Sequence, residues 1–263
     1  MRSQRLSEIE EYIYTHKTVT LDELCQIFQV SKNTIRRDIE EIIQNPDIVK
    51  TYGGVMVNTQ VKKPLVSFSE RNVKHQEAKR LISARAAALV NEGDSIFIDS
   101  GTTTLYMLEH LKDKRITLLT NSIEVMVQAI PYETINLISL SGTLNRKTLS
   151  FTGNNAARLL SSYNIQKAFL SATGITLENG ATNSSPEETC IKEMAVKKSM
   201  EKYLLADSSK FSSVSLLTYC DVKDLTGIIT DQKPDTDFCD YAAEHQVSLI
   251  IAGQSCKARP ERA

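Results

Sequence analysis

The sequence predicts a two-domain α/β protein, with a small winged helix-turn-helix at the N-terminus and a larger domain built on a mostly parallel sheet. Two observations predict this class. The first 57 residues hold short amphipathic helices and then a hairpin centred on two glycines. From residue 76 onward, short apolar strands alternate with helical segments, a pattern typical of a parallel sheet covered by helices on both faces.

A helix predicted over residues 31–43 has one apolar face and one polar face. Ser31 is a suitable N-cap, because its hydroxyl can accept a hydrogen bond from the first helical turn. The apolar side chains fall on a single stripe, at Ile35, Ile39, Ile42 and Ile43. Asn33, Arg36 and Arg37 lie on the opposite side, and such side chains can pair with phosphates and base edges. A polar face by itself is more often simply solvated, so the neighbouring segments decide its meaning.

The residues before this helix predict a helix-turn-helix. Thr20 and Glu23 form a capping box at the start of an amphipathic helix over residues 21–28, and a further helix over residues 3–16 precedes it. Only two residues separate the end of the 21–28 helix from the Ser31 cap. A junction this tight is typical of a helix-turn-helix, in which the second helix enters the major groove of DNA.

The segment after it, residues 47–57, predicts a hairpin, because Gly53 and Gly54 supply the positive φ angles that a tight turn needs. Three helices and a hairpin make a winged helix-turn-helix, so we expect residues 1–57 to bind double-stranded operator DNA. The side chains predicted to contact DNA are Lys32, Asn33, Thr34, Arg36, Arg37, Lys50 and Tyr52.

The charge of the chain excludes a general nucleic-acid binder. The formal net charge is −1, and residues 1–57 carry seven Lys and Arg against nine Asp and Glu, a net charge of −2. Binding without sequence preference needs a broad basic surface. A protein that binds one specific DNA sequence can instead concentrate its basic side chains on one helix. Assembly of two copies then doubles the number of these side chains. We therefore expect a homodimer or homotetramer held together by the larger domain.

Cysteine usage and hydropathy point to a cytoplasmic protein. The five cysteines are widely scattered and show none of the Cys/His spacings of a metal site, so we expect reduced thiols, no metal and no cofactor. Met1 leads directly into a polar helix, and no apolar run approaches the roughly 20 residues of a membrane span. We expect neither a signal peptide nor a membrane partner.

The larger domain is predicted over residues 76–255, after a linker at 58–75 where the periodicity lapses, and before a disordered tail at 256–263. Strands are predicted at 96–98, 116–119, 135–140, 168–171, 203–206, 227–230 and 248–251. Helices are predicted at 77–91, at 102–111, up to residue 130, at 186–202 and at 238–245.

Polar segments follow several of these strands, and open α/β sheets bind ligands beyond the carboxyl ends of their strands. Backbone N–H groups and hydroxyls at the following helix starts attract anions, and nearby basic side chains can neutralise a phosphate. Asp99 and Asn183 can pair with sugar hydroxyls. One such loop is more often an ordinary helix cap, but five on one edge favour a binding site. The effector-binding residues predicted here are Asp99, Ser100, Gly101, Thr102, Thr103, Thr104, Asn121, Ser122, Arg146, Asn183 and Lys210.

The N-terminal motifs resemble those of the DeoR family of bacterial transcriptional regulators. The family pattern V-S-x-x-T-I-R-R-D-L, followed by a wing ending in (H/Y)-G-G, is matched by Val30-Ser31, residues 34–38 and residues 52–54. The chain departs from the family between helix and wing, where residues 45–47 read Asn-Pro-Asp instead of a pair such as Lys-Gly. The proline there still ends the helix.

The remaining motifs resemble the DeoR-type sensor domain, which is related in fold to ribose-5-phosphate isomerase. The family's D-S-G-T-T lies at residues 99–103, its T-N at 120–121 and its A-D-x-S-K-F at 206–211, and Ser141-Gly142 replaces a common Gly-Gly. The resemblance adds Gly174 and Glu187 to the expected effector-binding residues. It implies a repressor released by a phosphorylated sugar or polyol inducer. Several segments also resemble repressors of myo-inositol utilisation, which implies an intermediate of that pathway.

Two alternatives use the same loops. A sugar-phosphate isomerase-like enzyme fused to a DNA-binding domain would also need a general base, which isomerases take from a D-G-A-D-E loop. Residues 178–183 lack that acidic pair, so we expect no enzymatic activity. A sensor of an unphosphorylated sugar is the other alternative, and the anion-binding loops argue against it.

Overall fold

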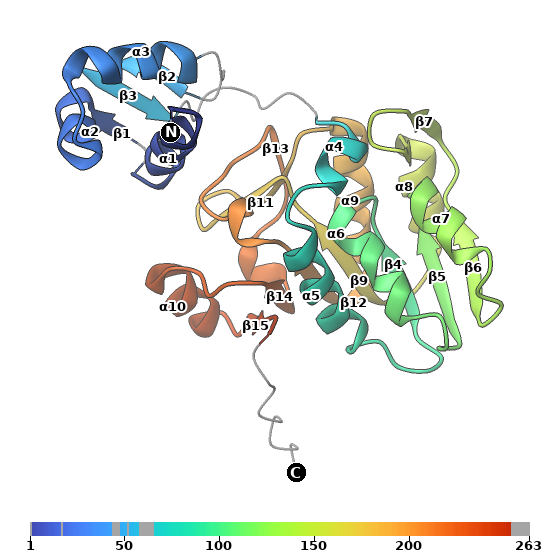
Figure 1. Cartoon of the computed structure of the whole chain (residues 1–263). Helices are drawn as coiled ribbons and strands as arrows, with labels where there is room; N and C mark the ends of the chain where they lie inside the picture. Colours follow the sequence, from blue (N-terminus) through green and yellow to red (C-terminus); the bar gives the residue numbers. More distant parts are fainter. Residues whose placement is uncertain (1, 17, 44–47, 52, 58–65, 254–263) are drawn as a thin grey trace. The chain divides into compact units, whose positions relative to one another are not determined.

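The computed structural model describes residues 2–16, 18–43, 48–51, 53–57 and 66–253. The chain divides into two compact units, residues 1–63 and 64–263, each described here by itself (Figure 1). The expectations for Tyr52, for the junction at 45–47 and for the tail at 256–263 lie outside the described residues.

The first unit is a winged helix-turn-helix, as predicted. Its helices are α1 (Arg2–His16), α2 (Leu21–Phe28) and α3 (Lys32–Ile42). Its strands are β1 (Thr18–Thr20), β2 (Ile48–Thr51) and β3 (Gly54–Val57), which form an antiparallel sheet in the order β1-β3-β2. A small core joins all of these elements, with Ile9 and Ile13 of α1, Leu24 of α2 and Ile35 of α3 fully buried.

The two glycines of the wing have different roles, which corrects the prediction that both supply positive φ angles. Gly53 does so, with φ +86°. Gly54 instead lies against β1, a strand that the sequence analysis missed: a Cβ at Gly54 would lie 2.2 Å from the carbonyl oxygen of Val19. Only a residue without a side chain allows β3 to approach β1 this closely.

The second unit is organised around a seven-stranded sheet in the order β15-β14-β12-β9-β4-β5-β6. Every neighbouring pair in it is parallel. The strands are β4 (Ser95–Ile98), β5 (Ile116–Thr120), β6 (Ile135–Ser139), β9 (Ile165–Ser171), β12 (Ser199–Leu205), β14 (Gly227–Thr230) and β15 (Ser248–Ile251). The predicted parallel α/β sheet is confirmed.

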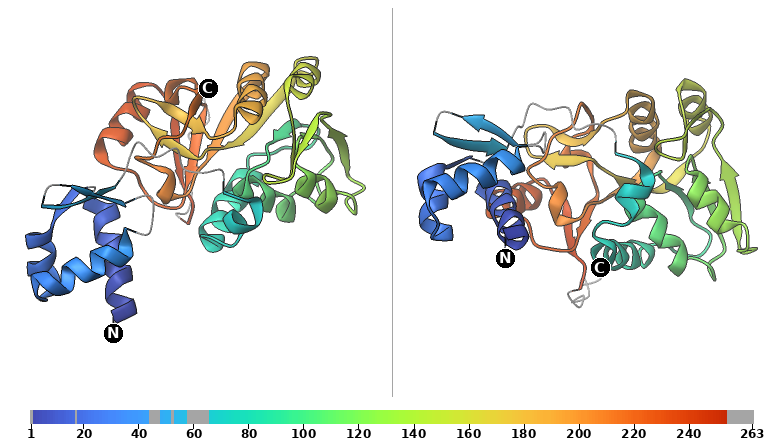
Figure 2. Two further views of the ribbon diagram at one scale, coloured as in Figure 1. Left: turned by 90° about the horizontal axis from the view of Figure 1, so that it is seen from above. Right: turned by 45° about the horizontal axis from the view of Figure 1, so that its top comes forward.

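Alternating side chains of the strands bury against helices on both faces of this sheet (Figure 2). Ile96 and Ile98 belong to one apolar cluster, and Phe97, between them in β4, belongs to the other. The first cluster packs against α4 (Phe68–Asn72), α5 (Gln76–Ala87), α6 (Thr102–Leu105), η1 (Tyr106–His110) and α7 (Ile123–Ala129). The second packs against α8 (Asn154–Leu160), α9 (Pro186–Lys198) and α10 (Thr236–Glu244).

Several predicted boundaries were wrong, most clearly at the polar ends of two central strands. The helix predicted to reach residue 202 ends at Lys198, and β12 begins at Ser199 rather than residue 203. Its partner β9 begins at Ile165 rather than residue 168, and the two early segments pair with each other, Ser199 opposite Ile165. Backbone pairing, not apolar content, defines these ends, so hydropathy alone does not reveal them.

The remaining elements lie outside this sheet. They are the hairpin β7 (Thr143–Asn145) and β8 (Ser150–Thr152), the antiparallel sheet of β10 (Gly174–Thr176), β11 (Gly180–Asn183) and β13 (Leu217–Cys220), and the short helices η2 (Ser208–Lys210) and η3 (Val222–Asp224). Within the described ranges, no helix has the length and apolar content to cross a bilayer.

Candidate functional site

The polar face of α3 is exposed in the first unit. Ser31 caps the helix, its Oγ accepting from the Thr34 backbone N–H at 3.3 Å, and Ile35, Ile39 and Ile42 are buried. The predicted DNA-contacting side chains that are exposed are Lys32, Asn33, Arg36, Arg37 and Lys50. Thr34 is half-buried. The orientation that helical periodicity predicted for this face therefore holds in the fold.

A buried carboxylate fixes α3 against α1, and the sequence analysis did not identify it. Asp38, which follows the two arginines on α3, is 1% exposed and accepts from Arg5 Nε at 2.8 Å and Nη2 at 3.4 Å. The hydrogen bond to Asp38 raises the pKa of Arg5. This contact holds the buried side of α3, so the opposite face presents Arg36 and Arg37 in a defined direction.

The turn of the wing supports the start of α2. The capping box forms as predicted, with Thr20 N donating to Glu23 Oε2 at 2.7 Å and Glu23 N donating to Thr20 Oγ1 at 3.2 Å. The Glu23 carboxylate accepts from the Thr20 backbone N–H and, at 2.8 Å, from Thr20 Oγ1, and these two hydrogen bonds lower its pKa. The next amide, Leu21 N, donates to the Gly53 carbonyl oxygen at 3.0 Å. Lys32 reaches back to Asp22 at 2.6 Å, an exposed ion pair that contributes little stability.

In the second unit, the strand order reverses between β4 and β9, and the loops after these two strands meet there. Such a topological switch point is where open α/β sheets bind ligands. Asp99 follows β4, and its Oδ2 accepts from the backbone N and Oγ of Ser171, at the end of β9, both at 2.8 Å. Its Oδ1 accepts from Gly101 N at 2.9 Å and Thr104 Oγ1 at 2.8 Å.

Lys192, from the middle of α9, forms an ion pair with Asp99. Burial by itself would raise the pKa of Asp99, but the Lys192 ammonium and the surrounding donors hold it below its ordinary value. Tyr219 donates to the Ser171 carbonyl at 2.9 Å, and burial together with the Asp99 charge raises its pKa. Both oxygens of Asp99 thus accept hydrogen bonds from the protein and shape the site, and its pairing with sugar hydroxyls stays a prediction.

Two further contacts shape these loops. Glu188, near the start of α9, accepts from Ser100 Oγ at 3.2 Å and from Ser150 Oγ at 2.7 Å, joining the loop after β4 to β8. A Cβ at Gly101 would lie 2.3 Å from Ser171 Oγ. The absence of a side chain at Gly101 therefore allows the loop after β4 to approach the end of β9 closely.

Four buried polar atoms near the carboxyl edge of the sheet have no hydrogen-bond partner among the described residues. They are Arg71 Nε, Asn72 Oδ1, Asn121 Oδ1 and Asp207 Oδ2. Asn121 and Asp207 are each 2% exposed and follow β5 and β12. Folded proteins satisfy nearly all buried polar atoms, because an unpaired one costs about 1–3 kcal/mol. A cluster of such atoms at a switch point indicates a site for a polar ligand.

Basic side chains gather at the same place. Lys79 of α5 is 3% exposed and donates to the Arg71 carbonyl oxygen. Burial lowers the pKa of Lys79 to about 8; the Asp207 carboxylate opposes this effect, and the positive charges of Lys210, Arg71 and Lys74 add to it. Burial also lowers the pKa of Arg71, although Glu188 and Asp99 attract its guanidinium. Arg71, Lys79 and Lys210, called the cation cluster below, are arranged to bind an anion.

The other predicted effector-binding residues fall into two groups. Thr102, Thr103, Thr104 and Ser122 are buried, and Ser122 caps α7 by accepting from Val125 N at 3.3 Å. Arg146 is exposed after β7. The remaining three residues are Gly174 in β10, Asn183 in β11 and Glu187 in α9. Of these three, a Cβ at Gly174 would lie 2.2 Å from the Ser213 carbonyl, Asn183 Nδ2 donates to the Ser185 carbonyl at 3.2 Å, and Glu187 accepts from Ser185 Oγ at 2.9 Å.

The sequence analysis missed several residues that the fold brings to this edge: Arg71, Asn72, Lys79, Glu188, Lys192 and Asp207. Asp207 stands in the quoted A-D-x-S-K-F motif, so a signal for it was present. Lys79 and Lys192 lie within helices, where an isolated lysine ordinarily indicates a solvated face.

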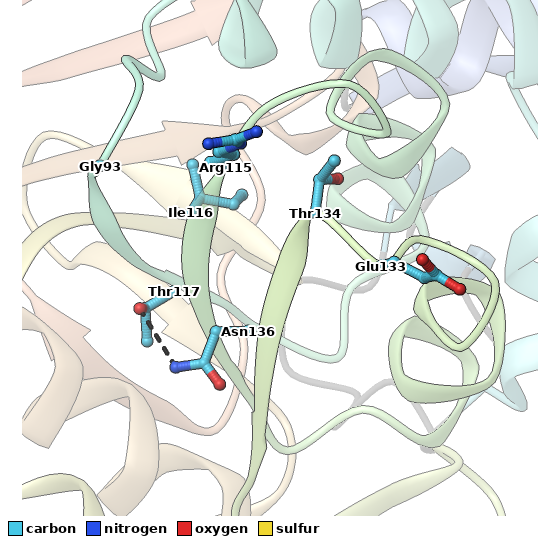
Figure 3. Close-up of a pocket in the computed structure, with 7 residues that line it drawn as sticks. All are labelled: Gly93, Arg115, Ile116, Thr117, Glu133, Thr134 and Asn136. Atoms are coloured by element: carbon cyan, nitrogen blue, oxygen red, sulfur yellow. Dashed lines mark hydrogen bonds between the residues drawn. The ribbon is translucent and has the colours of Figure 1, made fainter.

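A groove of about 520 Å³ lies at the opposite end of the sheet (Figure 3). It is lined by Gly93, Arg115, Ile116, Thr117, Glu133, Thr134 and Asn136, at the amino ends of β5 and β6. Asn136 and Thr117 face each other at 3.4 Å, so these polar groups already have partners. Because parallel sheets bind ligands at their carboxyl ends, this groove is not the candidate site.

Comparison with known proteins gives two family matches. Residues 5–61 match the DeoR-like helix-turn-helix domain, and residues 74–232 match the DeoR C terminal sensor domain. The HTH-type transcriptional regulator IolR of Bacillus subtilis (strain 168) is 45% identical over 254 residues, which cover 96% of this chain and 100% of that protein. The HTH-type transcriptional repressor GlcR of the same organism is 30% identical, with 96% and 97% covered.

A lactose phosphotransferase system repressor of Staphylococcus epidermidis is 31% identical over 229 residues, with 86% of this chain and 91% of that protein covered. Among solved structures, ribose 5-phosphate isomerase A of Methanocaldococcus jannaschii is similar with a TM-score of 0.40 and 18% identity, covering 52% of this chain and 55% of that one. The sorbitol operon regulator SorC of Klebsiella pneumoniae is similar with a TM-score of 0.37 and 10% identity, covering 78% of this chain and 89% of that one.

Proposed function

The chain belongs to the DeoR family of DNA-binding transcriptional regulators, which are not enzymes, and from this premise we propose that it represses a sugar or polyol catabolic operon. The operon we propose is one for myo-inositol utilisation, and the inducer is a phosphorylated intermediate of that pathway. The pathway assignment rests on the sequence resemblance to inositol repressors and on 45% identity to IolR over nearly the whole chain.

The observation that supports a phosphorylated inducer is that cationic groups and unpaired acceptor atoms lie together at the switch point. The cation cluster supplies guanidinium and ammonium donors, which a phosphate accepts in charge-assisted hydrogen bonds. Asp207 Oδ2, Asn121 Oδ1 and Asn72 Oδ1 are unpaired acceptors, which hydroxyl groups satisfy as donors. A phosphorylated sugar or polyol carries both kinds of group, whereas an unphosphorylated sugar brings no negative charge to the cation cluster.

The DNA-reading part of the proposal uses the exposed face of α3. Arg36, Arg37 and Asn33 contact base edges and phosphates of an operator in the bacterial cytoplasm, and a homodimer or homotetramer presents this face to repeated half-sites. The inducer lowers operator affinity only if it binds the DNA-free arrangement better than the DNA-bound one.

The test measures ligand binding and operator release on the same full-length protein. A panel of phosphorylated sugars and inositol-pathway intermediates, each beside its unphosphorylated parent, is screened for a rise in melting temperature. The compounds that bind are then titrated against the protein on the promoter of its own operon. We expect a phosphorylated compound to raise the melting temperature and release DNA while its parent does neither. Release by an unphosphorylated parent at the same concentration would contradict the proposal.

A further inference from the structure

We propose that Arg71 binds the anionic group of the effector directly and that occupation of the site thereby holds α4 in place. This inference rests on the proposed function for the identity of the effector, and it assigns an anion ligand to a helix outside the loops that follow the strands. Arg71 lies on α4, ahead of the first strand of the sheet.

The guanidinium of Arg71 lies over the Phe68 ring, 5.8 Å from its centroid, but has no carboxylate partner among the described residues. Its Nε is buried without a hydrogen-bond partner, and none of the described carboxylates forms an ion pair with it. Glu188 and Asp99 attract it from a distance, but Glu188 Oε1 accepts from Ser100 and Ser150, and Asp99 pairs with Lys192. Arg71 is half-buried, and a partly desolvated guanidinium favours an anion within hydrogen-bond reach, so an anion from solution is the partner that fits.

The groups that would share this anion come from separate segments. Arg71 is on α4, Lys79 is on α5, and Lys210 ends η2, after β12. The charges of Arg71 and Lys210 both repel that of Lys79, and the Asp207 carboxylate opposes this repulsion. A phosphate converts this repulsion into attraction and draws α4 toward the loop after β12.

α4 is suited to report this change. It is only five residues long, so local helix propensity does not stabilise it, and its position depends on its contacts. Those contacts are the buried Phe68 ring, the hydrogen bond from Phe68 N to the Lys147 carbonyl at 2.8 Å, and the hydrogen bond from Lys79 to the Arg71 carbonyl. In sequence, α4 is the first element after the segment that joins the two units. A ligand that fixes α4 therefore acts where the DNA-binding unit is attached.

The experiment uses full-length protein with inorganic phosphate as the probe, against chloride at matched ionic strength. Arg71→Gln is compared with Arg71→Lys, which keeps the charge, and with the control Arg80→Gln. Arg80 is an arginine of α5 that is exposed and pairs with Glu109 at 2.7 Å. The readouts are the melting temperature and the hydrogen exchange of the amides of residues 66–75.

In the unaltered protein and in Arg80→Gln, we expect phosphate to raise the melting temperature and to slow exchange in α4 at least tenfold. In Arg71→Gln both responses disappear, and in Arg71→Lys they are partial. Because the described residues give Arg71 no carboxylate partner, Arg71→Gln should lower the melting temperature in chloride only slightly, through loss of the contact with the Phe68 ring. A marked fall in chloride would show that Arg71 has a structural partner and would overturn the proposal. Retention of both phosphate responses in Arg71→Gln would overturn it equally.

Failure of the proposed function gives a different result. If phosphate protects α4 through Arg71 but no phosphorylated sugar or polyol releases operator DNA, the anion site stands and the proposed inducer is wrong. If a phosphorylated compound releases DNA from Arg71→Gln at the same concentration as from the unaltered protein, the inducer stands and the role of Arg71 is wrong.

Discussion

Lys192 of α9 and Asp99, the residue after β4, form a buried ion pair at the point where the strand order of the sheet reverses. Their side chains are 5% and 2% exposed. The pair connects a helix on one face of the sheet to the end of a central strand, and Asp99 in turn orders Gly101, Thr104 and Ser171. The loops of the candidate site are therefore held by an ion pair between two protein side chains.

Replacing Lys192 with Met should strongly destabilise the second unit. The change leaves the Asp99 carboxylate buried without its cation, and breaking a buried ion pair in this way costs about 3–5 kcal/mol. Denaturant unfolding followed by circular dichroism measures the loss. The double variant Asp99→Asn with Lys192→Met removes both charges and should recover part of the stability. A Lys192→Met protein as stable as the unaltered one would show that the pair contributes nothing.

The same variant should change the pH dependence of stability. The folded-state pKa of Asp99 is depressed, so its stabilising contribution is present above the unfolded pKa of about 3.9 and is lost as pH falls through the folded pKa. Without Lys192, only the hydrogen bonds to Asp99 oppose the effect of burial, so the pKa of Asp99 should rise. Protonation of Asp99 then costs the folded state less free energy, so Lys192→Met should lose less stability than the unaltered protein as pH falls below about 4, measured by urea unfolding at several pH values.

A methyl group at Gly54 should separate the wing from β1. The Cβ of Gly54→Ala would lie 2.2 Å from the backbone oxygen of Val19, and backbone cannot move away without breaking the β1–β3 pairing. We expect a loss of about 1–3 kcal/mol in the stability of the first unit, measured by urea unfolding. Gly53→Asn is the matched control, since nothing lies within 4 Å of a Cβ there and asparagine tolerates positive φ. Equal losses in the two variants would mean that only backbone conformation matters.

Arg37→Ala should abolish tight operator binding without unfolding the first unit. The side chain is exposed on the face of α3 opposite the buried isoleucines, and a lost base contact costs about 1–3 kcal/mol per half-site. Gel-shift titration on the promoter of its own operon measures the affinity. Arg5→Ala is the structural contrast, because it removes the partner of the buried Asp38 and should lower stability as well. Unchanged operator affinity in Arg37→Ala would refute the assignment of α3 as the recognition helix.

The structural features predicted best from the sequence are those that depend on residues close together in the chain. The Ser31 cap, the isoleucine stripe of α3 and the capping box at Thr20 follow from spacing within one helix, and all three are present. The strands at 227–230 and 248–251 match β14 and β15, because apolar runs bounded by polar turns determine them locally.

Features that depend on distant partners were not predictable in the same way. β1 is three residues long and exists through its pairing with β3, more than thirty residues later. Lys79 and Lys192 are buried only because the fold brings Asp207 and Asp99 to them. The sequence gives no sign that Asp99, which follows a strand, forms an ion pair with a lysine 93 positions further along the chain.

Effector binding should weaken as pH rises above about 8. Lys79 has a pKa lowered to about 8, so it loses its charge there, and only the ammonium attracts a phosphate. Isothermal titration with the phosphorylated effector at several pH values between about 7.5 and 9.5, where a phosphate monoester is already fully ionised, isolates this change. Lys79→Met should bind more weakly and lose the step near pH 8. An unaltered protein whose affinity is flat across this range would exclude Lys79 from the anion site.

Removing a cation from the site should produce a repressor that binds DNA but is not released. Lys210→Ala leaves α3 unchanged, so operator affinity without effector should stay the same. Release requires the effector to prefer the DNA-free arrangement, and each tenfold loss of operator affinity needs about 1.4 kcal/mol of that preference. A variant that binds the effector weakly gains too little of this free energy at the same effector concentration. The regulated genes should therefore stay off when the sugar is present. Thr103→Val tests the hydroxyl of the loop after β4 in the same assay. Arg37→Ala is the control, because it should leave the regulated genes on.

If both pocket variants release DNA at the effector concentration at which the unaltered protein releases it, these loops are structural and the effector binds elsewhere.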